Sequence, residues 1–142
     1  MRNGLTRSPV ASEQPRLLLN GALMTTAAEL RQKRCLPCEG GVTPLTAEQI
    51  SEHMAAVPDW HLAAIGKSIH REWRVKDFEA ALAFFNAVGL LAEDQDHHPD
   101  LHLTGYRNVR VELSTHALGG LSENDFILAA RIDQVPVELK KG

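Results

Sequence analysis

The chain has 142 residues and a mass of 15.6 kDa, with 44% hydrophobic and 23% charged residues; this size suits one domain with one ordinary core and a tail. A formal net charge of -3 and a pI near 6.1 leave no basic footprint, which argues against nucleic acid or an anionic membrane as the main partner. No apolar run approaches the roughly 20 residues of a membrane span, and two cysteines are too few for a disulfide framework. We therefore expect a soluble, cytoplasmic protein that acts on a small molecule or another protein.

Residues 1–34 are predicted to form a tail that is partly disordered or helical. The first 23 residues contain three arginines and a single acid, Glu13, a composition that faintly resembles a transit peptide. Organellar import therefore stays open. Residues 26–34 have better helix character, and Met24 before them is an alternative translation start.

Residues 35–45 are predicted to be a link, because a proline and two glycines interrupt the helical pattern. Cys35 and Cys38 can supply two zinc thiolates or a redox pair. A structural zinc site needs four ligands, however, and the chain has no second cysteine pair. Two reduced cysteines packed against the domain are the simplest interpretation.

The domain proper, residues 46–142, begins with a predicted helix and a hairpin. Thr46 and Gln49 have the spacing of a capping box, and a helix with one apolar face should run from there to Pro58. Residues 60–65 and 68–75 are predicted to be two strands around a Gly-Lys turn, since apolar and polar residues alternate in the second run.

The strongest helical pattern runs from Asp77, a suitable N-cap, to about Glu93. Its apolar residues recur at three- and four-residue intervals and predict a buried stripe. The stripe consists of Phe78, Leu82, Phe85, Val88, Gly89 and Ala92, broadened by Ala81 and Leu90. Pro99 prevents the helix from continuing.

Two more strands and a helix complete the pattern. Residues 101–103 and 108–116 alternate as strands around a turn at Gly105, and Ser122 is placed to cap the last helix. The element order is αββαββα. Strands joined by tight hairpins are antiparallel, so the sequence predicts an α+β fold in which one sheet packs its apolar face on the helices.

Titratable side chains are concentrated between residues 93 and 125. The histidines there are His97, His98, His102 and His116, and the carboxylates are Glu93, Asp94, Asp96, Asp100 and Asp125. Imidazoles beside carboxylates are suited to proton transfer near neutral pH.

A hairpin between residues 101 and 115 would fold His116 back toward His97 and His98, so that three imidazoles could line one pocket. Separate exposed histidines are one alternative, and a three-histidine zinc site is another. Adjacent histidines rarely aim at one ion, and the chain has no helical His-x-x-x-His pair, so we predict no metal.

The spacing of these residues resembles the signature of the pterin-4a-carbinolamine dehydratases. The matching positions are Glu93, His97-His98-Pro99, Tyr106, His116 and Asp125. Residues 76–78 and 120–133 and the Cys-Leu-Pro-Cys link also resemble the family, so the likeness extends from about residue 35 to residue 135. Two departures are a hairpin one residue longer before Tyr106 and Asn124 at a position where some members carry arginine.

The resemblance implies a four-stranded antiparallel sheet with three helices packed on one face, in a homodimer or homotetramer. It implies a hydro-lyase that removes water from 4a-hydroxytetrahydropterin to give quinonoid dihydropterin, which recycles the tetrahydrobiopterin of aromatic amino-acid hydroxylases. No metal or organic cofactor is implied.

The resemblance also assigns roles, because loss of the 4a-hydroxyl needs an acid and a base on either side of a flat ring. His98 is the candidate acid at the 4a-oxygen, and His97 and His116 are candidates for binding and for the base. Glu93 and Asp96 would orient imidazoles, and Asp125 would support His116 or the site wall. Backbone groups of Ser114 and Thr115 would bind the pterin edge. Pro99 of the motif is a further supporting residue.

A protein-binding role is the alternative from another class. Relatives in this fold family act as a transcriptional coactivator or as Rubisco assembly factors. Members that lost the enzymatic role would be expected to lose the His-His-Pro motif, and this chain keeps it. The enzyme is therefore the favoured hypothesis.

Overall fold

The computed structural model describes residues 18–19, 22–23, 25–37 and 42–142. The expectations for residues 1–17 and for Cys38 lie outside these described residues. The elements in chain order are β2 (Leu18–Leu19), β3 (Ala22–Leu23), α1 (Ala27–Gln32), α2 (Ala47–Ala56), β4 (His61–Leu62), β5 (Ile69–Arg74), α3 (Phe78–Gln95), β6 (Asp100–Thr104), β7 (Asn108–Leu113), the 3-10 helix η2 (His116–Leu118) and α4 (Glu123–Ile132).

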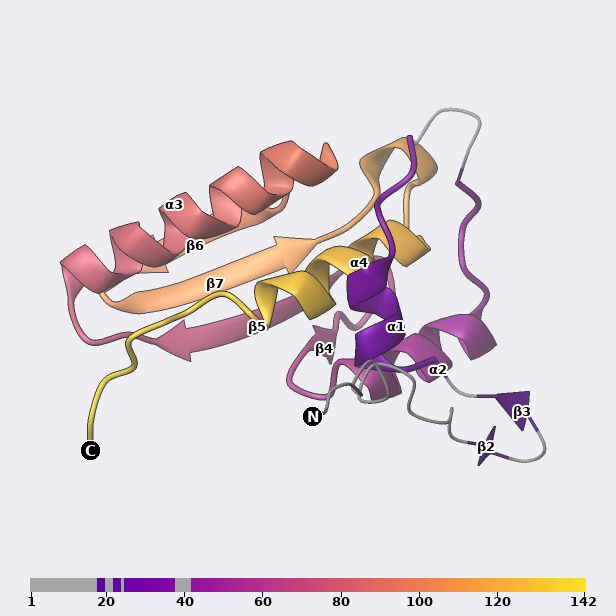
Figure 1. Ribbon diagram of the computed structural model, residues 1–142, viewed down its shortest axis with the longest axis horizontal. Coiled ribbons are helices and arrows are strands. Elements are labelled where there is room, and N and C mark those ends of the chain that lie inside the picture. The colour runs from indigo at the N-terminus through magenta and orange to yellow at the C-terminus, as the bar shows by residue number, and fades with distance from the viewer. Residues whose placement is uncertain (1–17, 20–21, 24, 38–41) are drawn as a thin grey trace, which may run out of the picture.

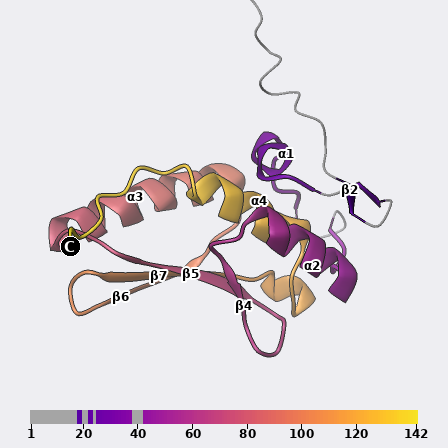
Figure 2. The same cartoon turned by 90° about the horizontal axis from the view of Figure 1, so that it is seen from below.

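The predicted α+β fold is confirmed. Strands β4 to β7 form one antiparallel sheet in the order β4-β5-β7-β6 (Figure 1). Helices α2, α3 and α4 lie on one side of this sheet (Figure 2). None of the described α-helices covers its other side, which we call the open face. The register pairs Ile69 with Leu113 and Asp100 with Glu112, so the strand after the His-His-Pro motif lies beside the strand before His116.

The core lies between the sheet and the three helices that cover it. Its largest buried side chains are Trp60, Phe84, Phe126, Ile69, Leu113, Leu128 and Ile132. The alternation predicted for residues 68–75 gives β5 its buried Ile69 and Trp73. None of the described helices is long and apolar enough to cross a membrane.

The capping box predicted at Thr46 begins α2, with the Gln49 N–H donating to the Thr46 hydroxyl at 3.2 Å. A second capping box at Thr26 and Glu29 begins α1. Helix α1 packs against α4, and its Leu30 is completely buried in the core. The residues just before the link are therefore part of the packed domain.

The predicted stripe on α3 is wrong for several of its members. The residues that α3 buries are Ala80, Ala81, Phe84, Val88, Ala92 and Gln95. Phe78, Leu82 and Leu90 are instead 51%, 44% and 75% exposed. This helix is apolar on two sides, so periodicity could not tell which side faces the sheet.

The strand predicted for residues 108–116 also ends early. Strand β7 stops at Leu113, and Thr115 forms an isolated bridge with Gly120. His116 is the first residue of η2 instead of the last residue of a strand. The paired glycines after it close a loop of which Gly119 takes the left-handed conformation (φ 65°).

Candidate active site

The backbone at the end of α3 points the two adjacent histidines in different directions. Asp96 adopts the left-handed conformation (φ 52°, ψ 41°). Its N–H donates to the Glu93 carbonyl at 3.3 Å, and the His97 N–H donates to the Ala92 carbonyl at 3.2 Å. These two bonds are those of a Schellman motif. After this turn His97 is only 5% exposed, whereas the His98 side chain is 55% exposed.

His97 lies against a completely buried carboxylate. Its Nε2 is 2.7 Å from Asp125 Oδ1, and Asp125 has 0% exposure. The other oxygen, Oδ2, accepts from the Thr115 hydroxyl at 2.8 Å and from the Ser122 N–H at 3.0 Å. Asp125 is in the first turn of α4, where the positive end of the helix dipole stabilises a negative charge.

This environment determines which ring nitrogen of His97 is available. A carboxylate that already accepts two other hydrogen bonds acts as an acceptor toward His97 as well, so Nε2 carries the hydrogen. The neutral ring then has its lone pair on Nδ1. His97 is therefore held in one orientation and one tautomer, as a proton-transferring imidazole requires.

His98 forms a second, exposed pair. Its Nε2 lies 2.5 Å from Glu93 Oε2, and the two side chains are 55% and 75% exposed. They line a groove of about 580 Å³ together with Pro99 and several apolar side chains of α3 and β6. A groove with an apolar floor and titratable groups on its wall suits a flat, partly polar ring.

The remaining predicted residues fall at the edges of these two pairs. Thr115 is buried and contributes its hydroxyl to the Asp125 network, where the resemblance had implied only its backbone. His116 follows it directly, is exposed, and makes no side-chain hydrogen bond within the part of the chain that is described. Ser114 is half-buried between Thr115 and the end of β7. Asp96 is exposed at the turn.

Asp125 was expected beside His116 or in the site wall. In the structure its carboxylate contacts His97. Sequence reasoning missed the Ser122 hydroxyl, which lies 2.8 Å from the Thr115 hydroxyl, although Ser122 and Asp125 have the spacing of a cap.

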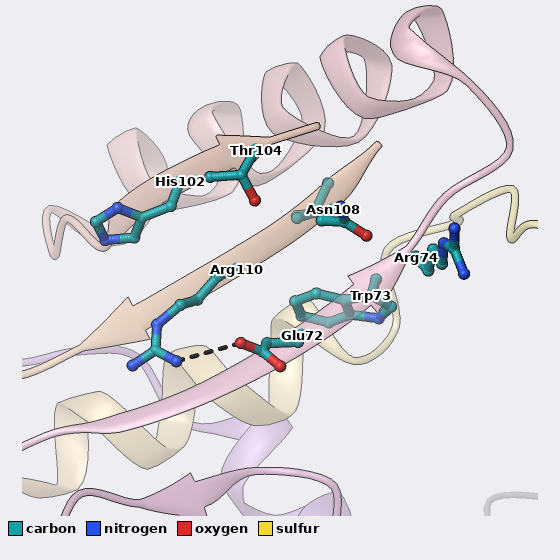
Figure 3. A pocket seen from close by; sticks show the side chains of 8 residues that line it. Glu72, Trp73, Arg74, His102, Thr104, Asn108 and Arg110 are labelled. Atoms are coloured by element: carbon teal, nitrogen blue, oxygen red, sulfur yellow. Dashed lines mark hydrogen bonds and ion pairs between the residues drawn. The ribbon is translucent and has the colours of Figure 1, made fainter. Parts of the chain in front are cut away.

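His102 belongs to a different region, a hollow of about 440 Å³ on the open face of the sheet. Figure 3 shows His102, Arg110 and Glu72 on three neighbouring strands. Arg110 lies 3.3 Å from Glu72, so the charges there compensate one another. His102 is thus separated from the His97 and His98 pairs.

Among residues 18–19, 22–23, 25–37 and 42–142, no group of three or more His, Cys, Asp and Glu side chains is arranged to hold a metal ion. The chemistry available at the junction of α3 and α4 is that of imidazoles and carboxylates. The fold and this site define a small α+β protein with a histidine–carboxylate centre.

Residues 43–135 match the family described as pterin 4 alpha carbinolamine dehydratase, and the chain belongs to that family. It is 46% identical over 114 residues to pterin-4-alpha-carbinolamine dehydratase 2, mitochondrial, of Arabidopsis thaliana, a match that covers 78% of this chain and 61% of the plant protein. It is also 46% identical over 109 residues to a putative pterin-4-alpha-carbinolamine dehydratase of Nitrosospira multiformis, covering 77% of this chain and 94% of the relative.

A solved structure is similar as well. The crystal structure described as a transcriptional coactivator/pterin dehydratase from Brucella melitensis has a TM-score of 0.61 and 31% sequence identity, and the match covers 66% of this chain and 98% of that chain. The family resemblance inferred from the sequence is confirmed.

Proposed function

We propose that this protein is a pterin-4a-carbinolamine dehydratase, which removes water from 4a-hydroxytetrahydropterin to give quinonoid dihydropterin. The observation that carries the proposal is the pairing of two adjacent histidines with separate carboxylates, His97 with Asp125 and His98 with Glu93. One imidazole is buried and fixed, and the other borders an open groove. The family membership of residues 43–135 supports the same activity.

In the proposed reaction, protonated His98 donates to the 4a-oxygen, so that the C4a–O bond breaks and the oxygen leaves as water. A base removes the proton from the adjacent ring nitrogen, whose electron pair forms the new C=N bond. We assign substrate binding and the base to His97 and His116, with the ring edge bound by backbone groups of Ser114 and Thr115. Glu93 holds the His98 imidazole through the contact of its Oε2 with His98 Nε2.

The test is the rate of dehydration of freshly generated 4a-hydroxytetrahydropterin. Wild type should exceed the spontaneous rate, and a His97→Ala/His98→Ala variant should lose about 10²-fold or more of that acceleration. His102→Ala is the matched control, because this histidine lies on the open face of the sheet, and it should keep wild-type turnover. Wild type at the spontaneous rate would refute the enzyme and favour the protein-binding alternative.

The variant His116→Ala tests whether His116 takes part in the reaction in addition to the His97–Asp125 and His98–Glu93 pairs. His116 is exposed at the start of η2, so its replacement should leave the fold intact and remove most of the activity. Unchanged turnover in this variant would remove His116 from the site and leave binding and base work to His97.

We further infer that the protein self-associates through α3. Phe78, Leu82, Phe85 and Gly89 follow a four-three-four spacing, the repeat of a helix–helix seam. Phe78 and Leu82 are about half exposed, and Phe85 is partly buried. A second copy can approach at Gly89, where an added Cβ would meet no atom within 4 Å. Because Phe85 and Gly89 also line the groove beside His98, the second copy would form one wall of that groove.

The oligomer is tested by sedimentation of Leu82→Glu beside Ala83→Glu, which adds the same charge at an exposed position one residue away. Leu82→Glu should sediment as a smaller species than wild type, and Ala83→Glu should not. Identical masses for all three proteins would exclude this seam. A self-associating dehydratase of this kind would return the pterin cofactor to aromatic amino-acid hydroxylases.

A further inference from the structure

Residues 33–36, which we call the strap, cross the junction between the end of α3 and the start of α4. The strap is bound mainly through its backbone. Four hydrogen bonds use the backbone of the strap: from the Cys35 N–H to Gln95 Oε1 (2.9 Å), from the Leu36 N–H to Asn124 Oδ1 (2.8 Å), from Asn124 Nδ2 to the Leu36 carbonyl (2.7 Å) and from Arg131 to the Lys33 carbonyl (2.6 Å). Two more use its side chains: from Arg34 to the Asp94 carbonyl (2.8 Å) and from Lys33 to Glu123 (3.0 Å).

Two of these partners are buried amides. Gln95 is 3% exposed and Asn124 is 2% exposed. Asn124 both accepts from and donates to the backbone of Leu36, as a neighbouring strand would. Buried amides without partners are costly, so the strap satisfies groups that the two helix ends would otherwise leave unpaired.

The same two helix ends carry the buried pair of the active site. Gln95 is the last residue of α3 and lies two residues before His97. Asn124 lies immediately before Asp125 in the first turn of α4. The strap therefore joins the two elements whose separation determines the 2.7 Å distance between His97 Nε2 and Asp125 Oδ1.

We propose that Gln95 and Asn124 are positioning residues that act through the strap to hold His97 against Asp125. Neither needs to touch the substrate. A small displacement of either helix end would lengthen a short hydrogen bond, and a misplacement of about 1 Å at a distance from the chemistry can cost about 10²-fold in rate. The kinetic part of this inference rests on the proposed dehydratase activity, whereas the geometric part does not.

The experiment compares Gln95→Leu, Asn124→Leu and the double variant in the full chain. Three quantities are measured: kcat and KM for dehydration, the nitrogen NMR signals of the His97 ring, and Tm. Each single variant should lower kcat by about 10-fold to 100-fold with KM within about twofold. The His97 Nε2 signal should move, and the double variant should be no worse than the stronger single variant, since both act through one strap.

Trp60→Phe is the control for loss of stability alone. It removes a buried hydrogen bond of 2.8 Å to Asp133, outside the strap, and should lower Tm while kcat and the His97 signal stay unchanged. Gln95→Leu and Asn124→Leu with lowered Tm but with unchanged kcat and an unchanged ring signal would overturn the proposal.

A milder variant covers the case in which the leucine variants fail to fold. Lys33→Ala/Arg34→Ala removes the exposed side-chain contacts of the strap, whose residues are 49% and 63% exposed. It should move the His97 ring signal in the same direction by a smaller amount, and an unchanged signal would refute the proposal. If wild type shows no dehydratase activity, the proposed function fails, and the ring signal still decides whether the strap positions His97.

Discussion

Two regions of this molecule carry histidines beside carboxylates, and their surroundings differ. At the junction of α3 and α4, His97 is 5% exposed and lies 2.7 Å from a carboxylate with 0% exposure. On the open face of the sheet, the His102 side chain is 51% exposed and lies 3.9 Å from Glu112. Glu112 is also 3.8 Å from Arg110, so a cation already compensates its charge.

The comparison shows that residue type alone does not fix the orientation of a histidine beside a carboxylate. A hydrogen bond in a dry interior is electrostatically stronger than one in water. An exposed ion pair contributes about 0–1 kcal/mol and does not fix a ring. Burial of Asp125, with donors from Thr115 and Ser122, gives His97 the fixed orientation that His102 does not have.

The largest expected difference is between Asp125→Asn and Glu112→Gln, which remove one carboxylate charge from each region. Asp125→Asn removes the obligatory acceptor of His97 Nε2, so the ring can take the wrong tautomer, and kcat should fall by about 10²-fold to 10⁴-fold. Glu112→Gln should leave kcat within about twofold. Dehydration rates at saturating substrate decide this, and equal losses in the two variants would show that the regions do not differ in function.

The two adjacent histidines should also differ in how much their removal destabilises the fold. His97→Ala leaves the Asp125 carboxylate buried without one of its partners, which should lower the free energy of unfolding by about 3–5 kcal/mol. His98→Ala removes an exposed pair and should change it by less than about 1 kcal/mol, although activity falls. Urea unfolding followed by circular dichroism measures both values. A His97→Ala protein as stable as His98→Ala would mean that the buried pair does not stabilise the fold.

Much of the fold could be predicted from the sequence because its signals are local. Capping residues, hairpin turns and alternation placed the strands β4 to β7 and the helices α2 to α4 in the right order. The phase of α3 could not be predicted, because Phe78 and Leu82 are as apolar as the residues that face the sheet. Small side chains such as Ala80 and Ala81 face the sheet instead.

The site was predictable as a set of residues but not as a set of contacts. The His-His-Pro spacing directed attention to the segment in which the structure has the pairs of His97 with Asp125 and of His98 with Glu93. The contact of Asn124 with Leu36, however, spans 88 positions in the sequence, and that of His97 with Asp125 spans 28. Contacts of this kind depend on how the helices pack, so no local pattern records them.

A smaller effect is expected at Asp96, immediately before the two histidines. An L-residue in the left-handed conformation costs roughly 1–2 kcal/mol, and glycine avoids this cost. Asp96→Gly should therefore raise the free energy of unfolding by about 0.5–1 kcal/mol, while Asp96→Val should lower it. If kcat is unchanged in Asp96→Gly, the residue serves the backbone turn; a large loss of kcat would restore the expected role of its carboxylate in orienting an imidazole.

The smallest expected effect is on the pH dependence of the free energy of unfolding, to which His70 on the open face of the sheet and Glu123 beside the strap each contribute. Burial, together with the positive charges of Arg110 and His61, lowers the pKa of His70 on the open sheet face below its ordinary value of 6.5, although Glu72 and Glu112 oppose this. The folded protein then binds this proton less readily than the unfolded chain. The contribution of His70 is therefore fully present above about pH 6.5 and is lost as the pH falls through the lowered pKa.

Glu123, beside the strap, titrates in a different range. Burial alone would raise its pKa, but hydrogen bonds from His53 and Lys33 outweigh burial and lower the pKa below 4.5. Its contribution is present above pH 4.5 and is lost as the pH falls through the lowered pKa. The test is the free energy of unfolding measured from pH 7 to pH 3. The decrease of this free energy that is due to protonation of His70 should be absent in His70→Gln, and the decrease due to protonation of Glu123 should be absent in Glu123→Gln. Because His70 is outside the proposed site, His70→Gln should also keep wild-type dehydration, and a loss of turnover there would mean that the open face of the sheet takes part in the chemistry after all.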